Sequence, residues 1–218
     1  MAAADVAAVR RRIEAACARV GRDGASVTLI GATKYATDDQ VLAVAEAGVV
    51  DLGENRPQAL RTRAALVPAA RWHAIGPLQR NKAGIVAELA VAFHALDRVE
   101  VAEALSARRP AGASPLAVYV EVNAAGESTK AGVAPADAAA LVEAAQRLPG
   151  LRVVGLMTMP PLATEPEDSR PWFAELRSLA ASLDLSDLSM GTTEDFEVAI
   201  EEGATAVRVG RAIFGERS

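Results

Sequence analysis

The stretch VTLIGATKYATDDQVLAVAEAGVVDLGEN, residues 27–55, holds one strand, one helix and the next strand. VTLIGATK (27–34) is a β-branched apolar run that is too short for a helix. Thr37 and the two aspartates after it can cap a helix that runs to Ala47. VVDLG (49–53) then begins a second unit of the same kind. Strands that alternate with helices in this way are typical of a parallel sheet.

The same alternation is expected to continue along the whole chain, after an N-terminal amphipathic helix near residues 5–20. The expected strands lie at residues 27–34, 49–53, 71–76, 91–96, 115–123, 151–159, 187–191 and 204–210. The expected helices lie at residues 37–47, 55–66, 79–89, 98–108, 135–147, 168–183 and 193–202, with a short terminal helix after them.

Two architectures use parallel strands with right-handed helical crossovers widely: the open doubly wound sheet and the closed (β/α)8 barrel. Eight regular units with no second zone of composition favour the barrel. We therefore predict an α/β fold, a (β/α)8 TIM barrel with an additional N-terminal helix, in a single domain over residues 1–218. Active sites of such barrels form at the carboxyl ends of the strands.

Composition argues against several classes of protein. The 23 Lys+Arg and 28 Asp+Glu give a formal net charge of -5, which disfavours a nucleic-acid or anionic membrane partner. The single cysteine, Cys17, excludes an intramolecular disulfide framework and a cysteine-based metal cluster. No apolar run is long enough to span a bilayer, and the N-terminal residues lack the order of a secretory signal. We expect a cytoplasmic protein with no nucleic acid, membrane or metal partner.

Lysine is rare in this chain, which has Lys34, Lys82 and Lys130 beside 20 arginines. Lys34 is placed at the carboxyl end of the first strand, where an amine in a mostly apolar cavity can attack an aldehyde and an arginine cannot. A surface lysine at a strand exit is the alternative that position alone leaves open. Lys82, at a helix start, and Lys130, in a loop, are better read as solvated charges.

An anion site is indicated at the ends of the last two strands. Gly191-Thr192-Thr193 follows the seventh strand and opens the next helix, so backbone N–H groups and a hydroxyl can converge on an anion. Arg208 and Gly210 end the eighth strand, where glycine allows close backbone approach. The alternative is an ordinary helix cap and an ordinary turn. A lysine that captures an aldehyde, opposite a phosphate site, suggests pyridoxal 5'-phosphate.

Four further residues are weaker candidates. Asn55 follows the second strand and could bind a polar ligand group or cap a helix. Met157 ends the sixth strand and could lie against a flat ring, although packing is the commoner role. His73 and His94 lie within apolar strands, where a histidine is more often a packed, hydrogen-bonded core group than a catalyst. We assign no catalytic residue.

Seven ordered blocks of the sequence carry a resemblance to a known family. The blocks are GATK (31–34), GEN (53–55), WHAIGPLQRNK (72–82), VNAAGESTKAG (122–132), GLMTM (155–159), LSMGTTEDFEVAI (188–200) and VRVGRAIFG (207–215). Together they resemble the pyridoxal phosphate homeostasis proteins. Members of that family are single-domain barrels similar to the N-terminal domain of bacterial alanine racemase, and they bind pyridoxal phosphate as a Schiff base.

The resemblance implies a role for each matching residue. It makes Lys34 the Schiff-base lysine and Asn55 a neighbour of the polar edge of the cofactor ring. Thr193 stands where the family commonly has a phosphate-binding serine. The resemblance also implies that Arg208 lies near the pyridine nitrogen and that the backbone N–H of Gly210 binds phosphate. A positive charge beside that nitrogen opposes its protonation, which fits cofactor binding better than amino-acid chemistry.

Two departures from the family pattern concern Arg211, where a serine or threonine is common, and the stretch after Lys34. Arg211 could add a phosphate contact or face solvent. The resemblance implies a non-catalytic protein that buffers or delivers the cofactor and maintains vitamin B6 and amino-acid homeostasis. Its expected partners are the small-molecule cofactor and, transiently, client enzymes that use it; we expect a monomer. The alternatives are a weak amino-acid racemase and, less favoured, a Schiff-base aldolase.

Overall fold

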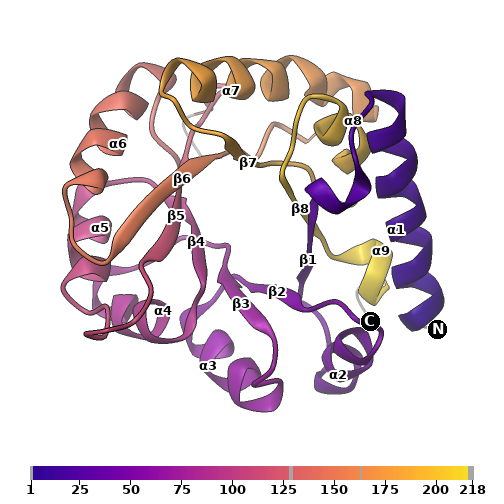
Figure 1. The fold of residues 1–218 in the computed structure, drawn as a ribbon, viewed down its shortest axis with the longest axis horizontal. Coiled ribbons are helices and arrows are strands. Elements are labelled where there is room, and N and C mark those ends of the chain that lie inside the picture. Colours follow the sequence, from indigo (N-terminus) through magenta and orange to yellow (C-terminus); the bar gives the residue numbers. More distant parts are fainter. Residues whose placement is uncertain (1, 128–129, 163, 216–218) are drawn as a thin grey trace.

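The computed structural model describes residues 2–127, 130–162 and 164–215, and these form a closed barrel of parallel strands surrounded by helices (Figure 1). The strands pair in chain order from β1 to β8, and β8 pairs back with β1 through Thr28 and Ala206. The predicted TIM barrel is therefore confirmed. Residues 1 and 216–218 of the predicted domain, and residues 128–129 of one resembling block, lie outside the described residues.

Each predicted strand overlaps one strand of the barrel, although several end earlier than expected. The strands are β1 (Thr28–Ala32), β2 (Asp51–Glu54), β3 (Arg71–Ala74), β4 (Ala92–Leu96), β5 (Leu116–Glu121), β6 (Leu151–Met157), β7 (Asp187–Ser189) and β8 (Ala206–Val209).

The predicted helices are also present. Short 3-10 helices precede β1 and lie in three of the segments between strands. The α-helices are α1 (Ala2–Arg19), α2 (Asp38–Glu46), α3 (Pro57–Leu66), α4 (Ala83–Leu89), α5 (Val99–Ser106), α6 (Ala138–Gln146), α7 (Arg170–Ser182), α8 (Phe196–Glu201) and α9 (Arg211–Phe214). The 3-10 helices are η1 (Gly24–Ser26), η2 (Arg80–Lys82), η3 (Pro135–Asp137) and η4 (Pro166–Ser169).

The start of α2 shows how local sequence sets an element. The Thr37 hydroxyl accepts a hydrogen bond from the Gln40 N–H, and the Gln40 side chain accepts one from the Thr37 N–H. This reciprocal pair is a capping box, and it satisfies two backbone donors that the helix cannot pair internally. The cap predicted at Thr37 is therefore confirmed.

One predicted helix begins later than expected. The sequence suggested a start at Thr193, but α8 begins at Phe196. The carboxylate of Asp195 accepts a hydrogen bond from the Thr192 N–H at 2.7 Å, and the Thr192 carbonyl accepts one from the Phe196 N–H. These bonds make residues 192–195 a turn that leads into the helix. Gly191, with φ of +91°, begins the turn in a conformation that favours glycine.

Helix α1 closes the outside of the barrel beside the last helices of the chain (Figure 1). Its apolar face, formed by Val6, Val9, Ile13 and Cys17, is buried, as the helical spacing predicts. Among the described residues, no helix is both long enough and apolar enough to cross a membrane.

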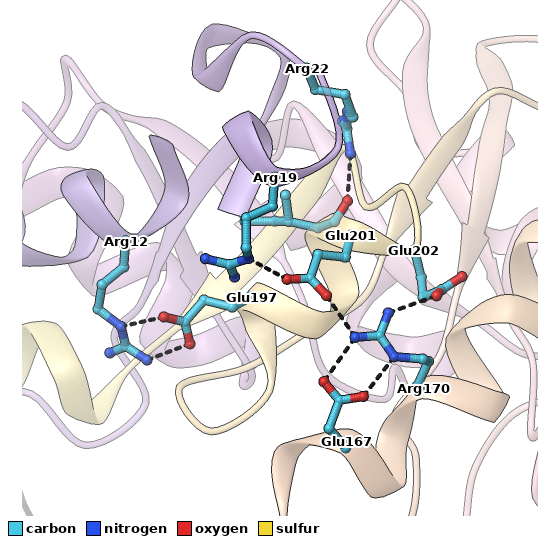
Figure 2. A network of polar contacts seen from close by, with 9 residues as sticks. Arg12, Arg19, Arg22, Glu167, Arg170, Glu197, Glu201 and Glu202 are labelled. Atoms are coloured by element: carbon cyan, nitrogen blue, oxygen red, sulfur yellow. Dashed lines mark hydrogen bonds and ion pairs between the residues drawn. The ribbon is translucent and has the colours of Figure 1, made fainter. Parts of the chain in front are cut away.

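A network of arginines and glutamates fastens α8 to α1 and to the start of α7 (Figure 2). Arg12 and Arg19 of α1 bind Glu197 and Glu201 of α8 at 2.7 and 2.6 Å. Arg170 at the start of α7 binds Glu201 from the other side at 2.6 Å, and also binds Glu167 and Glu202. Because Glu201 and Arg170 each belong to more than one pair, the contacts from Arg19 to Arg170 act as a network rather than as isolated surface pairs. Helix α8, which follows the 191–195 turn, is thus held from two sides.

Candidate functional site

A cavity of about 300 Å³ lies at the carboxyl ends of the strands, at the end of the barrel where this fold places active sites. Its lining comes from strands or following loops on both sides of the barrel, so residues distant in sequence meet there. All six residues selected from the sequence line it: Lys34, Asn55, Met157, Thr193, Arg208 and Gly210.

Lys34 lies farther from the strand than the sequence suggested. Strand β1 ends at Ala32, and the Lys34 side chain is exposed at the edge of the cavity. Its Nζ lies 5.2 Å from the centroid of the exposed Tyr35 ring. The sequence left open whether Lys34 faces a cavity or the surface, and in the structure it does both: its side chain lines the cavity and is exposed, so the amine is accessible to a ligand that enters from solvent.

The loops after β1 and β2 are joined by the buried carboxylate of Glu54, which the sequence did not single out. It accepts a hydrogen bond from the Thr33 hydroxyl at 2.8 Å, and bonds from the N–H groups of Asn55 and Arg56 at 2.8 and 3.3 Å. Glu54 is 2% exposed. One carboxylate therefore fixes the backbone next to Lys34 and that of Asn55.

Glu54→Ala is expected to lower the free energy of unfolding by about 3 kcal/mol, because two backbone N–H groups lose their buried acceptor. Glu54→Gln is the matched control: its amide oxygen can still accept from those N–H groups, and we expect a loss of about 1 kcal/mol or less. Urea denaturation of both variants measures the difference. Equal losses in the two variants would contradict this role for Glu54.

Asn55 is half-buried beside the loop that follows β3. A Cβ placed on Gly76 would lie only 2.6 Å from the Asn55 carbonyl oxygen, so the two backbones touch. Glycine at position 76 thus permits the close approach that holds Asn55 at the cavity. Met157, at the end of β6, is 2% exposed and contributes an apolar wall.

Arg208 is a buried cation in the cavity wall, with an exposed fraction of 5%. Its guanidinium donates to the Ser189 hydroxyl, to the Thr158 carbonyl at 3.0 Å and to the Met159 sulfur at 2.9 Å. Burial lowers the pKa of Arg208 to about 10, a value at which it is still charged at neutral pH. These acceptors are neutral, so the positive charge is available to a group inside the cavity.

Glu121 is a second ionisable group in the cavity wall and is not among the six residues selected from the sequence. It ends β5, is 8% exposed and lines the cavity with Arg208. Burial raises the pKa of its carboxyl to about 7; nearby Asp97 adds to the increase, while Arg208 opposes it. The signal in the sequence was a single glutamate within the apolar run LAVYVEV (116–122).

The Thr193 hydroxyl lies where the last two loops meet. It accepts hydrogen bonds from the backbone N–H groups of Gly210 and Ala212 at 3.3 and 3.4 Å. The turn that carries Thr193 is held by Asp195, which also accepts a bond from the buried Ser169 hydroxyl at 2.9 Å. The Thr193 hydroxyl and the Gly210 N–H thus lie together in the lining of the cavity.

The other two lysines lie elsewhere. Lys82, in η2, lines a separate cavity of about 650 Å³ with Arg61 and Arg108. Lys130 donates to the Pro160 carbonyl at 2.8 Å, which joins the loops after β5 and β6. Of the three lysines, Lys34 is the one among the lining residues of the strand-end cavity.

Comparison with known proteins places this arrangement in a family. Residues 4–218 match the family model described as alanine racemase, N-terminal domain. A pyridoxal phosphate homeostasis protein of Pseudomonas aeruginosa is 44% identical over 99% of this chain and 95% of the relative. The chain belongs to the pyridoxal phosphate homeostasis protein family. The Escherichia coli K12 member of that family is 37% identical over 98% of this chain and 95% of its own length.

Solved structures agree with the family membership. PipY of Synechococcus elongatus, in a structure with PLP bound, is 29% identical and superposes with a TM-score of 0.84, covering 99% of this chain and all of PipY. An alanine racemase of Clostridium difficile, at 12% identity, superposes with a TM-score of 0.73 over 94% of this chain and 55% of the racemase. The second likeness is one of fold alone.

Arg211, which departs from the pattern expected of the homeostasis protein family, is an exposed residue at the edge of the cavity. Its guanidinium donates to the Glu194 carboxylate at 2.7 Å, next to the turn that carries Thr193. The sequence left open whether Arg211 contacts phosphate or faces solvent. In this structure its charge is paired with Glu194 at the surface.

Proposed function

We propose that this chain binds pyridoxal 5'-phosphate in the strand-end cavity and is a non-catalytic protein that buffers or delivers the cofactor. Through this role it helps to maintain vitamin B6 and amino-acid homeostasis. The observation that carries the proposal is the meeting of Lys34, Arg208 and the Thr193–Gly210 pair at one cavity. The names of its relatives and the PLP-bound PipY structure support the same cofactor.

The residues present suit the chemical groups of this cofactor. When bound, the cofactor supplies an aldehyde that condenses with a primary amine and releases water. Lys34 is the amine at the cavity. The Thr193 hydroxyl and the Gly210 N–H can donate to phosphate oxygens, and Met157 offers an apolar surface to a flat ring. Asn55 carries donors and an acceptor for the polar edge of the ring.

Arg208 suits a ring nitrogen that carries no proton. A guanidinium has donors and no acceptor, so a ring atom that meets it must accept. A second positive charge on that atom would be repelled, and the repulsion weakens the capacity of the ring to draw electrons from a substrate. This feature favours storage of the cofactor over turnover of amino acids.

A weak racemase is the second candidate, favoured by one observation. Racemisation needs two groups that exchange protons, and Glu121, with a pKa raised to about 7, stands in the same cavity as Lys34. An assay with L-alanine separates the two candidates: sustained formation of D-alanine by the loaded protein would favour the enzyme.

A cytoplasmic location, a monomeric state and client enzymes remain predictions.

Titration of the purified full chain with pyridoxal 5'-phosphate tests the proposal. We expect saturable binding of one cofactor per chain and a visible absorption band that disappears on borohydride reduction. Mass spectrometry of the reduced protein should locate the adduct at Lys34. A protein that stays colourless after the titration would contradict the proposed function.

A further inference from the structure

Five buried side chains form a hydrogen-bonded chain through the inside of the barrel. The Arg208 guanidinium donates to Ser189 Oγ, which lies 2.8 Å from His94 Nδ1. His94 Nε2 lies 2.9 Å from His73 Nδ1, and His73 Nε2 lies 2.9 Å from Asp51 Oδ1. Each of the five residues is at most 8% exposed. We call this set the Arg208–Asp51 chain.

The Arg208–Asp51 chain joins the two ends of the barrel. Arg208 lines the cavity at the carboxyl ends of the strands. Asp51 is the first residue of β2 and lines a different cavity, of about 600 Å³, at the end where the strands begin. There the exposed Arg71 side chain also donates to the Asp51 carboxylate. The His94 ring is held flat against Tyr119, with centroids 4.4 Å apart.

The chemistry of the two end groups sets the direction of the hydrogen bonds between them. Arg208 can only donate, so Ser189 Oγ accepts from it and is free to donate its one hydrogen to His94 Nδ1. At the other end, burial raises the pKa of Asp51, but hydrogen bonds from His73 and Arg71 outweigh burial and the pKa is lowered. An ionised Asp51 can only accept, so His73 Nε2 carries hydrogen.

These two assignments agree on a single pattern. His94 Nδ1 accepts from Ser189, which leaves hydrogen on His94 Nε2 to donate to His73 Nδ1. Both rings are then neutral and carry hydrogen on Nε2. For His94, burial, with His73 and Arg208 nearby, lowers the pKa well below its ordinary value, in keeping with a neutral ring.

In this pattern the dipoles of Ser189, His94 and His73 all point in the same direction along the Arg208–Asp51 chain. Each group turns its acceptor toward Arg208 and its hydrogen toward Asp51, so the dipoles lie favourably with respect to both end charges. Such aligned bonds strengthen one another in a buried environment. Of the three acceptors that the structure gives Arg208, Ser189 is the one linked to a carboxylate through other side chains.

We propose that Ser189, His94, His73 and Asp51 are positioning residues that hold the Arg208 guanidinium in the wall of the cofactor cavity. The hydrogen bonds of the Arg208–Asp51 chain exist without the cofactor, while their effect on cofactor binding rests on the proposed function. None of the four residues is assigned contact with the cofactor. Substitutions of His94 should therefore affect cofactor binding through the position of Arg208.

Nitrogen NMR of the full chain labelled with 15N-histidine, in the absence of cofactor, tests the direction of the bonds. The chain has two histidines, so the spectrum contains two rings, and a His94 variant assigns them. We expect both rings to be neutral with hydrogen on Nε2 at pH 7.5. Hydrogen on Nδ1 of either ring would overturn the proposed direction.

Two variants of His94 separate positioning from packing. His94→Phe keeps an aromatic ring against Tyr119 but breaks the hydrogen bonds to Ser189 and His73. His94→Gln loses the ring but can accept from Ser189 and donate to His73. We expect the dissociation constant of pyridoxal 5'-phosphate to rise about tenfold in the Phe variant, with a shifted absorption band, and about threefold or less in the Gln variant.

Thermal unfolding of both variants accompanies the binding measurement. A packing role alone would leave the Phe variant equal to or better than the Gln variant in binding, and that result would overturn the proposal. If His94→Phe does not fold, Ser189→Ala is the alternative variant, because it removes an acceptor of Arg208 with a smaller change in side-chain volume. We expect the dissociation constant of pyridoxal 5'-phosphate to rise in this variant too. A parent protein that fails to bind cofactor contradicts the proposed function and leaves the NMR result intact.

Discussion

Lys34→Ala is expected to abolish the borohydride-stable adduct with pyridoxal 5'-phosphate and to raise the dissociation constant roughly 100-fold, or about 2.7 kcal/mol. The reason is that the amine at the cavity forms the covalent link, while Arg208 and the Thr193–Gly210 pair retain weaker binding. Lys34→Arg keeps the positive charge and should lose the adduct equally, because a guanidinium does not form a stable Schiff base.

The two remaining lysines give internal controls for this experiment. Lys82→Ala changes a residue of a separate cavity and should leave the absorption band and the dissociation constant within about twofold of the parent. Absorption spectra, equilibrium dialysis and mass spectrometry of the reduced proteins measure these effects. An unchanged band in Lys34→Ala, with the adduct on Lys82 or Lys130, would refute the assignment of Lys34.

Glu121→Gln is expected to change how stability depends on pH. The pKa of Glu121 is raised from 4.5 to about 7 in the folded protein, chiefly by burial. Between those values the unfolded chain has released the proton that the folded chain keeps, so a rise in pH costs stability. The free energy of unfolding falls by about 3 kcal/mol in all as the pH rises from 4.5 to about 7. Below pH 4.5 this loss is absent, because Glu121 is protonated in both states.

Glutamine does not ionise, so the Glu121→Gln variant does not lose this unfolding free energy as the pH rises. Relative to the parent, it should gain up to about 3 kcal/mol of unfolding free energy at pH 8 and nothing comparable at pH 4.5. Urea denaturation of the cofactor-free proteins across this range measures the difference. Glu88→Gln, an exposed position on α4, is the matched control. If the difference in unfolding free energy between Glu121→Gln and the parent were the same at every pH, the raised pKa of Glu121 would be disproved.

The sequence predicted the barrel because its evidence is local and repeated. Short apolar runs and helix caps recur in order, and eight regular units with no second zone of composition favour a closed barrel over an open sheet. Residues at strand ends, such as Lys34 and Arg208, could be placed at one mouth because all carboxyl ends face the same way. The start of α8 was misplaced because the Asp195 carboxylate accepts a hydrogen bond from the Thr192 N–H, and this turn competes with a helix beginning at Thr193.

The residues that were missed depend on contacts between distant parts of the chain. Glu121 looks like any strand-end carboxylate until its burial is known. His73 and His94 were expected to be packed, hydrogen-bonded core groups, and this prediction is confirmed. Their link to Ser189 could not be predicted, because 95 residues separate it from His94. Composition and spacing carry no information on which side chains meet across a barrel interior.

The pairing of the first helix with the eighth has a consequence for biosynthesis. The ion pair between Arg12 and Glu197 joins residues 185 positions apart, and β1 depends on β8 for one of its two neighbours. A ribosome makes α1 and β1 first and their partners last, so the apolar face of α1 and one edge of β1 remain uncovered while most of the chain is translated. We expect the ring to close only after β8 has been synthesised, so β1 keeps one unpaired edge until then.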